Sequence, residues 1–196
     1  MIKKIIFFFL LLIPFTFSSA KNTVENLKIG NENSKITINV FSSLTCPHCA
    51  NFHKKIFKEL KREYIDTDKV KFVHYGFPLD LAALNAEKIL RCKINSTKKF
   101  EMLNEIYEKQ SEWAVGSDIK KINESLKKIG KNFDLSNEDM NKCLKDEEIE
   151  TKILNERISA QKNYEISSTP TIYINEKKYE GQHEYQKFKK ELEKFF

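Results

Sequence analysis

Beyond residue 17, the chain has no hydrophobic run long enough to cross a membrane. It has no block of basic residues interleaved with aromatic ones, and its formal net charge of +6 is spread along the sequence, so a nucleic-acid-binding protein is not indicated. Internal repeats and low-complexity linkers are also lacking. These absences favour a single domain, or a small domain that carries an insertion, with enough chain to bury a core.

The N-terminus has the three parts of an export signal. Residues 1–4 include two lysines, residues 5–17 are almost wholly apolar, and Ser18-Ser19-Ala20 puts small residues where a signal peptidase cuts. The apolar run is shorter than the ~20 residues that span a bilayer. We therefore expect a signal peptide over residues 1–20 that is cleaved after Ala20, and a mature protein in the periplasm. An uncleaved N-terminal tether is the alternative.

Two cysteines separated by two residues form the most informative motif, Cys46-Pro47-His48-Cys49. Residues 35–41 alternate in polarity and are β-branched, which predicts a strand, and residues 50–64 have the apolar spacing of a helix. Cys46 then lies where free backbone N–H groups and the helix dipole favour a thiolate, and Cys49 lies one turn inside the helix. The motif predicts a reversible dithiol–disulfide pair, and a protonated His48 would favour the thiolate further.

Zinc sites use the same cysteine spacing. A tetrahedral zinc site needs two more ligands, however, and Cys92 and Cys143 are isolated in the sequence. His48, between the two motif cysteines, is poorly placed to share a metal with both. We therefore expect no metal and no small-molecule cofactor, because the Cys46–Cys49 disulfide would itself carry the two electrons.

The rest of the chain alternates between strand and helix patterns. Residues 69–77 predict a strand, residues 80–163 a helical block with N-caps at Ser117 and Ser136, residues 171–175 and 177–179 two short strands, and residues 185–195 a closing helix. This order predicts an α/β protein with a thioredoxin-like fold interrupted by an all-helical insertion. The thioredoxin-like domain would comprise residues 21–79 and 164–196, and the insertion residues 80–163.

The chain resembles the DsbA family of exported thiol oxidases. The landmarks that carry the resemblance follow one another in order: Phe41 with Cys46-Pro47-His48-Cys49, then Gly76-Phe77-Pro78-Leu79, then Ser168-Thr169-Pro170-Thr171. The resemblance implies that Cys46 is the nucleophile, Cys49 the buried resolving thiol, and Pro170 a cis-proline that faces them. Backbone groups of Thr169 would pair with an extended substrate peptide. It also implies unfolded exported proteins as substrates and a DsbB-like membrane quinone reductase as the reoxidising partner.

The expected proton path departs from the family pattern. Well-studied relatives carry a buried acid on the first strand, where this chain has Val40. His53 and His74 lie near the expected site and could form a proton relay, because imidazole is a common general base. The alternative is that both are structural histidines.

Cys92 and Cys143 are left over once the motif is assigned. In an exported protein such a pair usually closes into a structural disulfide, and some DsbA relatives carry one in the helical block. Two buried free thiols are the alternative.

Two other classes of function remain open. One is a disulfide isomerase or reductase with the same motif, but isomerases usually append a dimerisation domain, and only residues 21–34 precede the first strand expected here. We therefore expect a monomer. The other is a non-catalytic binding protein on the same scaffold, which the two intact motif cysteines make less attractive.

Overall fold

The computed structural model describes residues 27–92 and 96–196, so the expected signal peptide over residues 1–20 lies outside the described residues. Strands of the described part form one mixed sheet with the order β1-β3-β2-β4-β5. Their bounds are Leu27–Ile29 (β1), Ile36–Ser42 (β2), Val70–Gly76 (β3), Thr171–Ile174 (β4) and Lys177–Lys178 (β5). β2 and β3 are parallel, and the other pairs are antiparallel. The short β1 is an element that the sequence analysis does not predict.

The helix that follows the cysteine motif begins earlier than expected. It runs without a break through α1 (Pro47–Phe52), a π-helical turn (His53–Phe57), α2 (Lys58–Leu60) and a second π-helical turn (Lys61–Ile65). Its start is Pro47, not Ala50, because proline at the first helical position has no N–H group to lose and a φ angle already suited to the helix.

The predicted helical block is confirmed. Between β3 and β4 the chain forms α3 (Leu81–Leu90), α4 (Ser96–Glu108), α5 (Gln110–Trp113), α6 (Ile119–Lys131), α7 (Asn137–Lys145) and α8 (Glu147–Tyr164). Ser136 caps α7 as predicted, with its Oγ accepting from the backbone N–H of Asp139 at 3.0 Å. The N-cap expected at Ser117 is wrong. Asp118 caps α6 instead, because it directly precedes the helix and its carboxylate accepts from two first-turn N–H groups.

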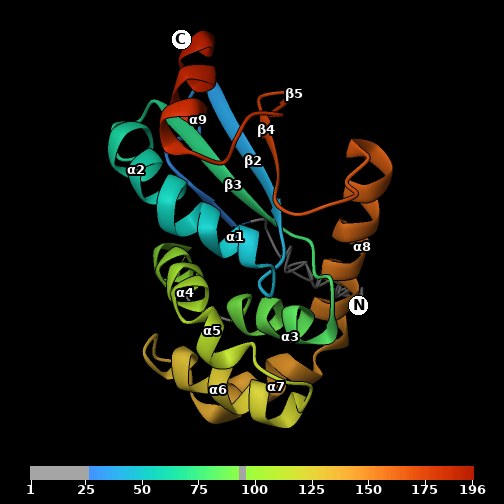
Figure 1. The fold of residues 1–196 in the computed structure, drawn as a ribbon. Helices are drawn as coiled ribbons and strands as arrows, with labels where there is room; N and C mark the ends of the chain where they lie inside the picture. Colours follow the sequence, from blue (N-terminus) through green and yellow to red (C-terminus); the bar gives the residue numbers. More distant parts are fainter. Residues whose placement is uncertain (1–26, 93–95) are drawn as a thin grey trace, which may run out of the picture.

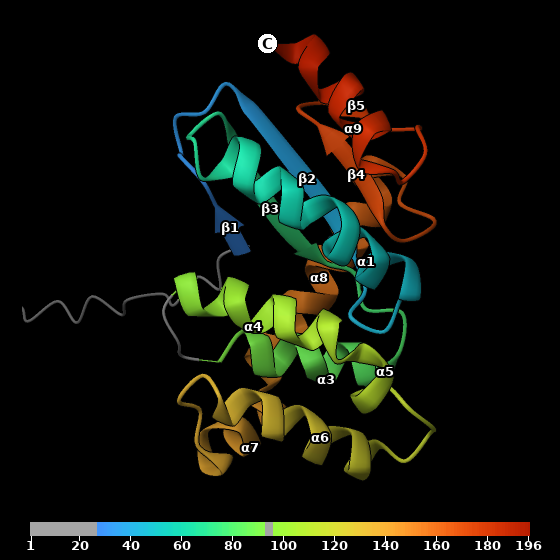
Figure 2. The same cartoon turned by 60° about the vertical axis from the view of Figure 1, so that its left-hand side comes forward.

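Helices cover both faces and one end of the sheet (Figures 1 and 2). The helix containing α1 and α2 lies on one face together with α9 (Tyr185–Leu192), whose Tyr185 hydroxyl donates to Glu63 at 2.6 Å. The end of α8 covers the other face, where Tyr164 packs on Phe41 of β2 with ring centroids 5.0 Å apart. Helices α3 to α7 gather beyond one end of the sheet, so the start of α1 lies at the junction between sheet and helical layer. This arrangement is the predicted thioredoxin-like fold with a helical insertion.

The predicted pairing of Cys92 with Cys143 is confirmed in the structure. A disulfide joins them, with Cα atoms 5.9 Å apart, and links the segment after α3 to α7. Within the described residues, no helix is both long enough and apolar enough to span a membrane.

Candidate redox site

The site is built where β2 ends and α1 begins. Cys46 occupies the N-cap position of α1, and its carbonyl oxygen accepts from the backbone N–H groups of Cys49 and Ala50, each at 3.1 Å. One residue of the helical layer holds the loop from outside by two hydrogen bonds. Gln110 of α5 donates to the carbonyl oxygens of Leu44 and Cys46 at 2.8 and 3.0 Å. The loop that presents the first cysteine is therefore fixed by the insertion as well as by the sheet.

The two motif cysteines are free thiols in the structure, and their surroundings differ. Cys46 keeps 7% of its surface exposed, whereas Cys49 is completely buried. The pKa of Cys46 is lowered to about 5, chiefly by the hydrogen bond from the Cys49 thiol, although partial burial opposes the shift. Burial raises the pKa of Cys49 well above its ordinary value, and the neighbouring Cys46 sulfur raises it further. The pair thus combines one acidic thiol that keeps a small exposed area with one thiol that is completely buried.

The loop before β4 faces this pair. The Thr169–Pro170 peptide bond is cis, as predicted. The Cys46 thiol donates to the carbonyl oxygen of Thr169 at 3.3 Å, and the Thr169 hydroxyl lowers the pKa of both cysteines. Pairing of Thr171 with Phe41 of β2 fixes the loop beside the motif.

His48 lies on the exposed side of the motif. Its effect on Cys46 comes through its backbone N–H group, which together with that of Cys49 lowers the pKa of the Cys46 thiol. Pro47 is the first residue of α1 and so places these N–H groups at the helix start, where they point towards the sulfur.

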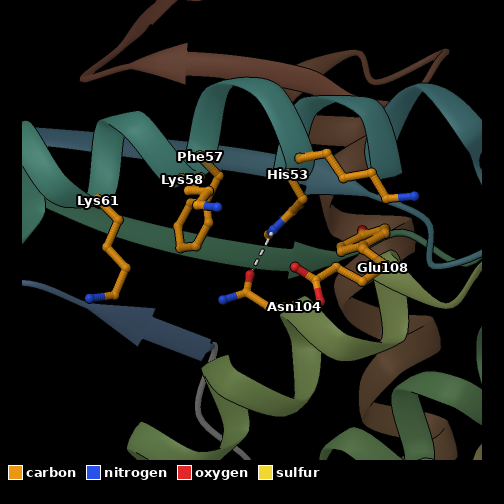
Figure 3. A pocket seen from close by; sticks show the side chains of 8 residues that line it. His53, Phe57, Lys58, Lys61, Asn104 and Glu108 are labelled. Carbon is orange, nitrogen blue, oxygen red and sulfur yellow. Dashed lines mark hydrogen bonds between the residues drawn. The ribbon is translucent and has the colours of Figure 1, made fainter.

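His53 lies behind the motif in the first π-helical turn. It borders a cavity of about 240 Å³ between α4 and the helix that contains α1 and α2 (Figure 3). Its Nδ1 shares a hydrogen bond of 3.3 Å with Oδ1 of Asn104, and its ring stacks on Tyr107 with centroids 4.3 Å apart. Burial, with a smaller contribution from His74, lowers the pKa of His53 to about 3. The imidazole is therefore neutral over the ordinary pH range.

His74 has a different environment. It lies on β3 opposite Val40 and is 1% exposed. Its Nδ1 shares a hydrogen bond of 3.1 Å with Ser42 Oγ, and its Nε2 donates to Glu87 Oε1 at 2.9 Å. A buried carboxylate therefore lies beside His74, and it comes from α3 in the helical layer.

The structure brings the sequence-predicted residues Cys46, Cys49, Thr169 and Pro170 into one site and leaves His53 and His74 in separate environments behind it. Sequence reasoning missed Gln110, Glu87 and Tyr107. The pattern gives no sign that the polar side chains of Glu87 and Gln110 turn inward. Tyr107 lies on an apolar helical face, which indicates its burial but not its place near the cysteine pair. Among the described residues, no three His, Cys, Asp or Glu side chains are arranged to hold a metal ion.

A sheet with a cysteine pair at a helix start, a cis-proline loop opposite it and an inserted helical layer defines a thioredoxin-fold protein with a dithiol site. Residues 22–194 match the family model described as thioredoxin. The crystal structure of Wolbachia pipientis α-DsbA1 superposes with a TM-score of 0.81 at 26% identity, covering 87% of this chain and 90% of that one. The chain belongs to the thioredoxin family and has the fold of its DsbA members.

Two relatives extend the comparison. A Rickettsia bellii protein, provisionally named a protein-disulfide oxidoreductase, is 35% identical over 153 residues, which is 77% of this chain and 57% of the relative. Disulfide bond formation protein D of Bacillus subtilis is 27% identical over 175 residues, covering 85% of this chain and 75% of its own length. The chain thus spans little more than half the length of the Rickettsia relative.

Proposed function

We propose that the protein is a periplasmic thiol–disulfide oxidoreductase that donates its Cys46–Cys49 disulfide to newly exported proteins. The observation that carries this proposal is the contrast between the two thiols, with the pKa of Cys46 at about 5 and that of Cys49 raised by burial. A stabilised Cys46 thiolate favours the reduced form, and a pair whose reduced form is stabilised is a strong oxidant as a disulfide. The names of the Rickettsia and Bacillus relatives support the same activity.

The reaction proceeds by two thiol–disulfide exchanges. A substrate thiolate attacks Cys46 Sγ, a mixed disulfide forms, and the bond to Cys49 breaks with its electron pair left on the Cys49 sulfur. A second substrate thiolate then attacks the substrate sulfur of the mixed disulfide and releases Cys46 as a thiolate. The substrate is oxidised by two electrons and the Cys46–Cys49 pair is reduced. The carbonyl of Thr169 lies beside the sulfur that is attacked, where an extended substrate backbone would pair.

We favour a role as an oxidase over a role as a reductase or isomerase for an electrostatic reason. A reductase needs a dithiol that gives up electrons readily, whereas the acidic Cys46 holds the pair in its reduced form. An isomerase with the same motif is the alternative, and it requires reduced enzyme and a surface that retains misfolded substrates. A non-catalytic binding protein is the less favoured alternative, since both thiols lie in a reactive arrangement.

The proposed partners and location follow from this role. Export over residues 1–20 with cleavage after Ala20 would place the protein in the periplasm, and N-terminal sequencing of the exported protein tests the cleavage site. A DsbB-like membrane quinone reductase would reoxidise the pair, and the protein would act as a monomer. Accumulation of the dithiol form in cells after quinone depletion is the expected sign of such a partner.

Two measurements test the activity. Equilibration with glutathione should give a reduction potential nearer to about −120 mV than to about −270 mV, the values typical of a strong oxidase and of a reductant. The disulfide form should oxidise a dithiol peptide rapidly and rescue a scrambled disulfide protein poorly. A C46S variant is the control, because it lacks the nucleophile and should do neither. A potential near the reductant value would overturn the proposal in favour of a reductase.

A further inference from the structure

The peptide group that joins Cys46 to Pro47 is held by a side chain of the helical layer. Proline has no N–H group, so the carbonyl oxygen of Cys46 is the only hydrogen-bonding atom of this peptide group. It accepts from Gln110 Nε2 at 3.0 Å, in addition to the helix-start bonds from Cys49 and Ala50. The orientation of this peptide group therefore depends on Gln110 as well as on α1.

The same amide nitrogen holds the loop at a second point. Gln110 Nε2 also donates to the carbonyl oxygen of Leu44 at 2.8 Å, so both of its hydrogens are used. Gln110 is 9% exposed and Leu44 is completely buried, so little water can take the place of the amide. Asp80 also reaches this loop, but it accepts from the Thr45 hydroxyl and so holds a side chain. Gln110 instead fixes the backbone, at the two carbonyl groups on either side of Thr45.

Gln110 is itself anchored to the rest of the helical layer. It lies on α5, a single turn of helix whose last residue, Trp113, is 2% exposed. The indole N–H of Trp113 donates to the carbonyl oxygen of Ile106 on α4 at 2.8 Å. Figure 2 shows α5 beside the loop that leads into α1. A series of contacts thus runs from α4 through α5 to the backbone of Cys46.

The backbone angles of Cys46 determine which groups its sulfur meets. Cys46 is the N-cap residue of α1, with φ −75° and ψ 120°, an extended conformation directly before the helix. In this conformation the N–H groups of His48 and Cys49 face the sulfur and lower the pKa of Cys46. These interactions act over hydrogen-bond distances, so each depends on where the sulfur lies. Rotation of the Cys46–Pro47 peptide group would change ψ of Cys46 and move the sulfur away from them.

We propose that Gln110 is a positioning residue of the redox site, which keeps Cys46 in the extended N-cap conformation in which the helix-start N–H groups face its sulfur. The inference rests on the proposed function. Gln110 exchanges no bond and no proton during the reaction. It acts through the backbone that carries the sulfur, because both of its hydrogen bonds end on carbonyl oxygens of the loop.

This role gives the helical insertion a part in the redox chemistry. The Cys46 thiolate belongs to the reduced form, so a contact that keeps its sulfur among the helix-start N–H groups stabilises that form. A pair whose reduced form is stabilised is more oxidising as a disulfide. The oxidising strength of the Cys46–Cys49 disulfide therefore depends on a side chain of α5, which lies outside the thioredoxin-like part of the chain.

A Gln110→Met variant tests the role, because methionine has nearly the length of glutamine but no hydrogen-bond donor. With both loop carbonyl groups released, we expect the midpoint of the Cys46 alkylation profile to rise by about one pH unit, the tenfold effect of losing one ordinary hydrogen bond to the thiolate. The equilibrium with glutathione at neutral pH should shift about tenfold towards the disulfide form of the protein. That shift corresponds to a reduction potential about 30 mV more negative.

Asn85→Leu is the matched control. Asn85 of α3 is also a side-chain amide that is 9% exposed, and its Nδ2 donates to Oδ1 of Asn123 on α6 at 3.0 Å, within the helical layer. Both variants lose a buried hydrogen bond of the helical layer, so a lower melting temperature is expected of both. Only Gln110→Met should change the alkylation midpoint and the glutathione equilibrium, and these two readouts separate positioning of Cys46 from general stability.

Wild-type values of both readouts in Gln110→Met would refute the proposal, and so would equal shifts in Asn85→Leu. If the methionine variant does not fold, Gln110→Asn serves the same test, because it keeps the amide on a side chain one methylene too short to hold both carbonyl groups. Its two readouts should shift in the same direction. Neither readout needs a protein substrate, so the comparison decides the role of Gln110 even if the wild type fails to oxidise a dithiol peptide, the outcome that would count against the proposed function.

Discussion

The thiol of Cys46 and the carbonyl oxygen of Thr169 are 3.3 Å apart, although 123 positions separate the two residues in the chain. The contact forms because β4 pairs with β2 in antiparallel register and carries the loop before it to the start of α1. The acidic sulfur is therefore held between a helix N-terminus and a backbone edge that an extended peptide could join.

Cys46 should react as a thiolate far below the pH at which an ordinary cysteine does. Its pKa of about 5 arises chiefly from the Cys49 thiol and is helped by the Thr169 hydroxyl and by backbone N–H groups at the helix start. Alkylation of the reduced protein, followed by peptide mapping, should label Cys46 first, with a rate that levels off above about pH 6, one unit above that pKa.

Cys49 provides the comparison within the same molecule, because burial raises its pKa and shields its sulfur. A Cys49→Ala variant should also shift the Cys46 profile to higher pH, since it removes the largest cause of the lowered pKa. Preferential labelling of Cys49 in the wild type would reverse the assigned roles.

The stability of the reduced protein should depend on pH in a direction fixed by Cys46. The folded pKa is about 5, below that of an unfolded cysteine at about 8.5, so the unfolded state binds more protons between these values. The free energy of unfolding should therefore rise with pH across this window. The whole contribution of Cys46 to that free energy should be present above the upper end of the window. Urea titrations at several pH values, compared with a Cys46→Ser variant, measure the difference. A difference that stays constant with pH would contradict the shifted pKa.

The disulfide between Cys92 and Cys143 should be structural and should outlast the redox pair under mild reduction. It closes a loop across 51 positions of the chain. Loop entropy for that length gives a stabilisation of about 4 kcal/mol, or roughly 10 °C in melting temperature for a chain of this size. A Cys92→Ala/Cys143→Ala variant should melt lower by that order, as measured by calorimetry, while the alkylation profile of Cys46 is unchanged. Recovery of both as free thiols from freshly prepared protein would show that the bond does not form.

The sequence is sufficient to predict the parts of this protein that depend on local pattern. Strand alternation, helical spacing and the Cys-Pro-His-Cys motif give the order of elements and place Cys46 at a helix start. The facing loop of Thr169 and Pro170 comes from resemblance, since nothing local tells a cis-proline from an ordinary one. The pairing of β4 with β2 that brings this loop to the motif is a long-range contact that the pattern does not encode.

The polar groups behind the motif could not be predicted for a related reason. Glu87 lies in α3, where Asn85 and Lys88 are buried as well, so its place depends on how α3 packs between the sheet and the other helices. Tyr107 lies on the apolar face of its helix, which indicates burial but not what its hydroxyl approaches. Gly76 belongs to a quoted landmark, yet only the structure shows that its missing side chain leaves space for the Glu87 carboxylate. The short β1 contributes partly exposed residues and has too few positions to show alternation.

Thr169 should tune the acidity of Cys46 through its hydroxyl. The Oγ1 atom is buried, has no conventional hydrogen-bond partner among the described residues, and lowers the pKa of both cysteines. A Thr169→Val variant keeps the shape but loses the hydroxyl, so we expect the alkylation profile of Cys46 to move to higher pH and the disulfide to become less oxidising. Thr169→Ser retains the hydroxyl and should stay closer to the wild type in both measurements. Because valine removes a buried polar atom without leaving another unpaired, its melting temperature should not fall. Identical profiles for the valine variant and the wild type would mean that backbone groups and Cys49 alone set the acidity of Cys46.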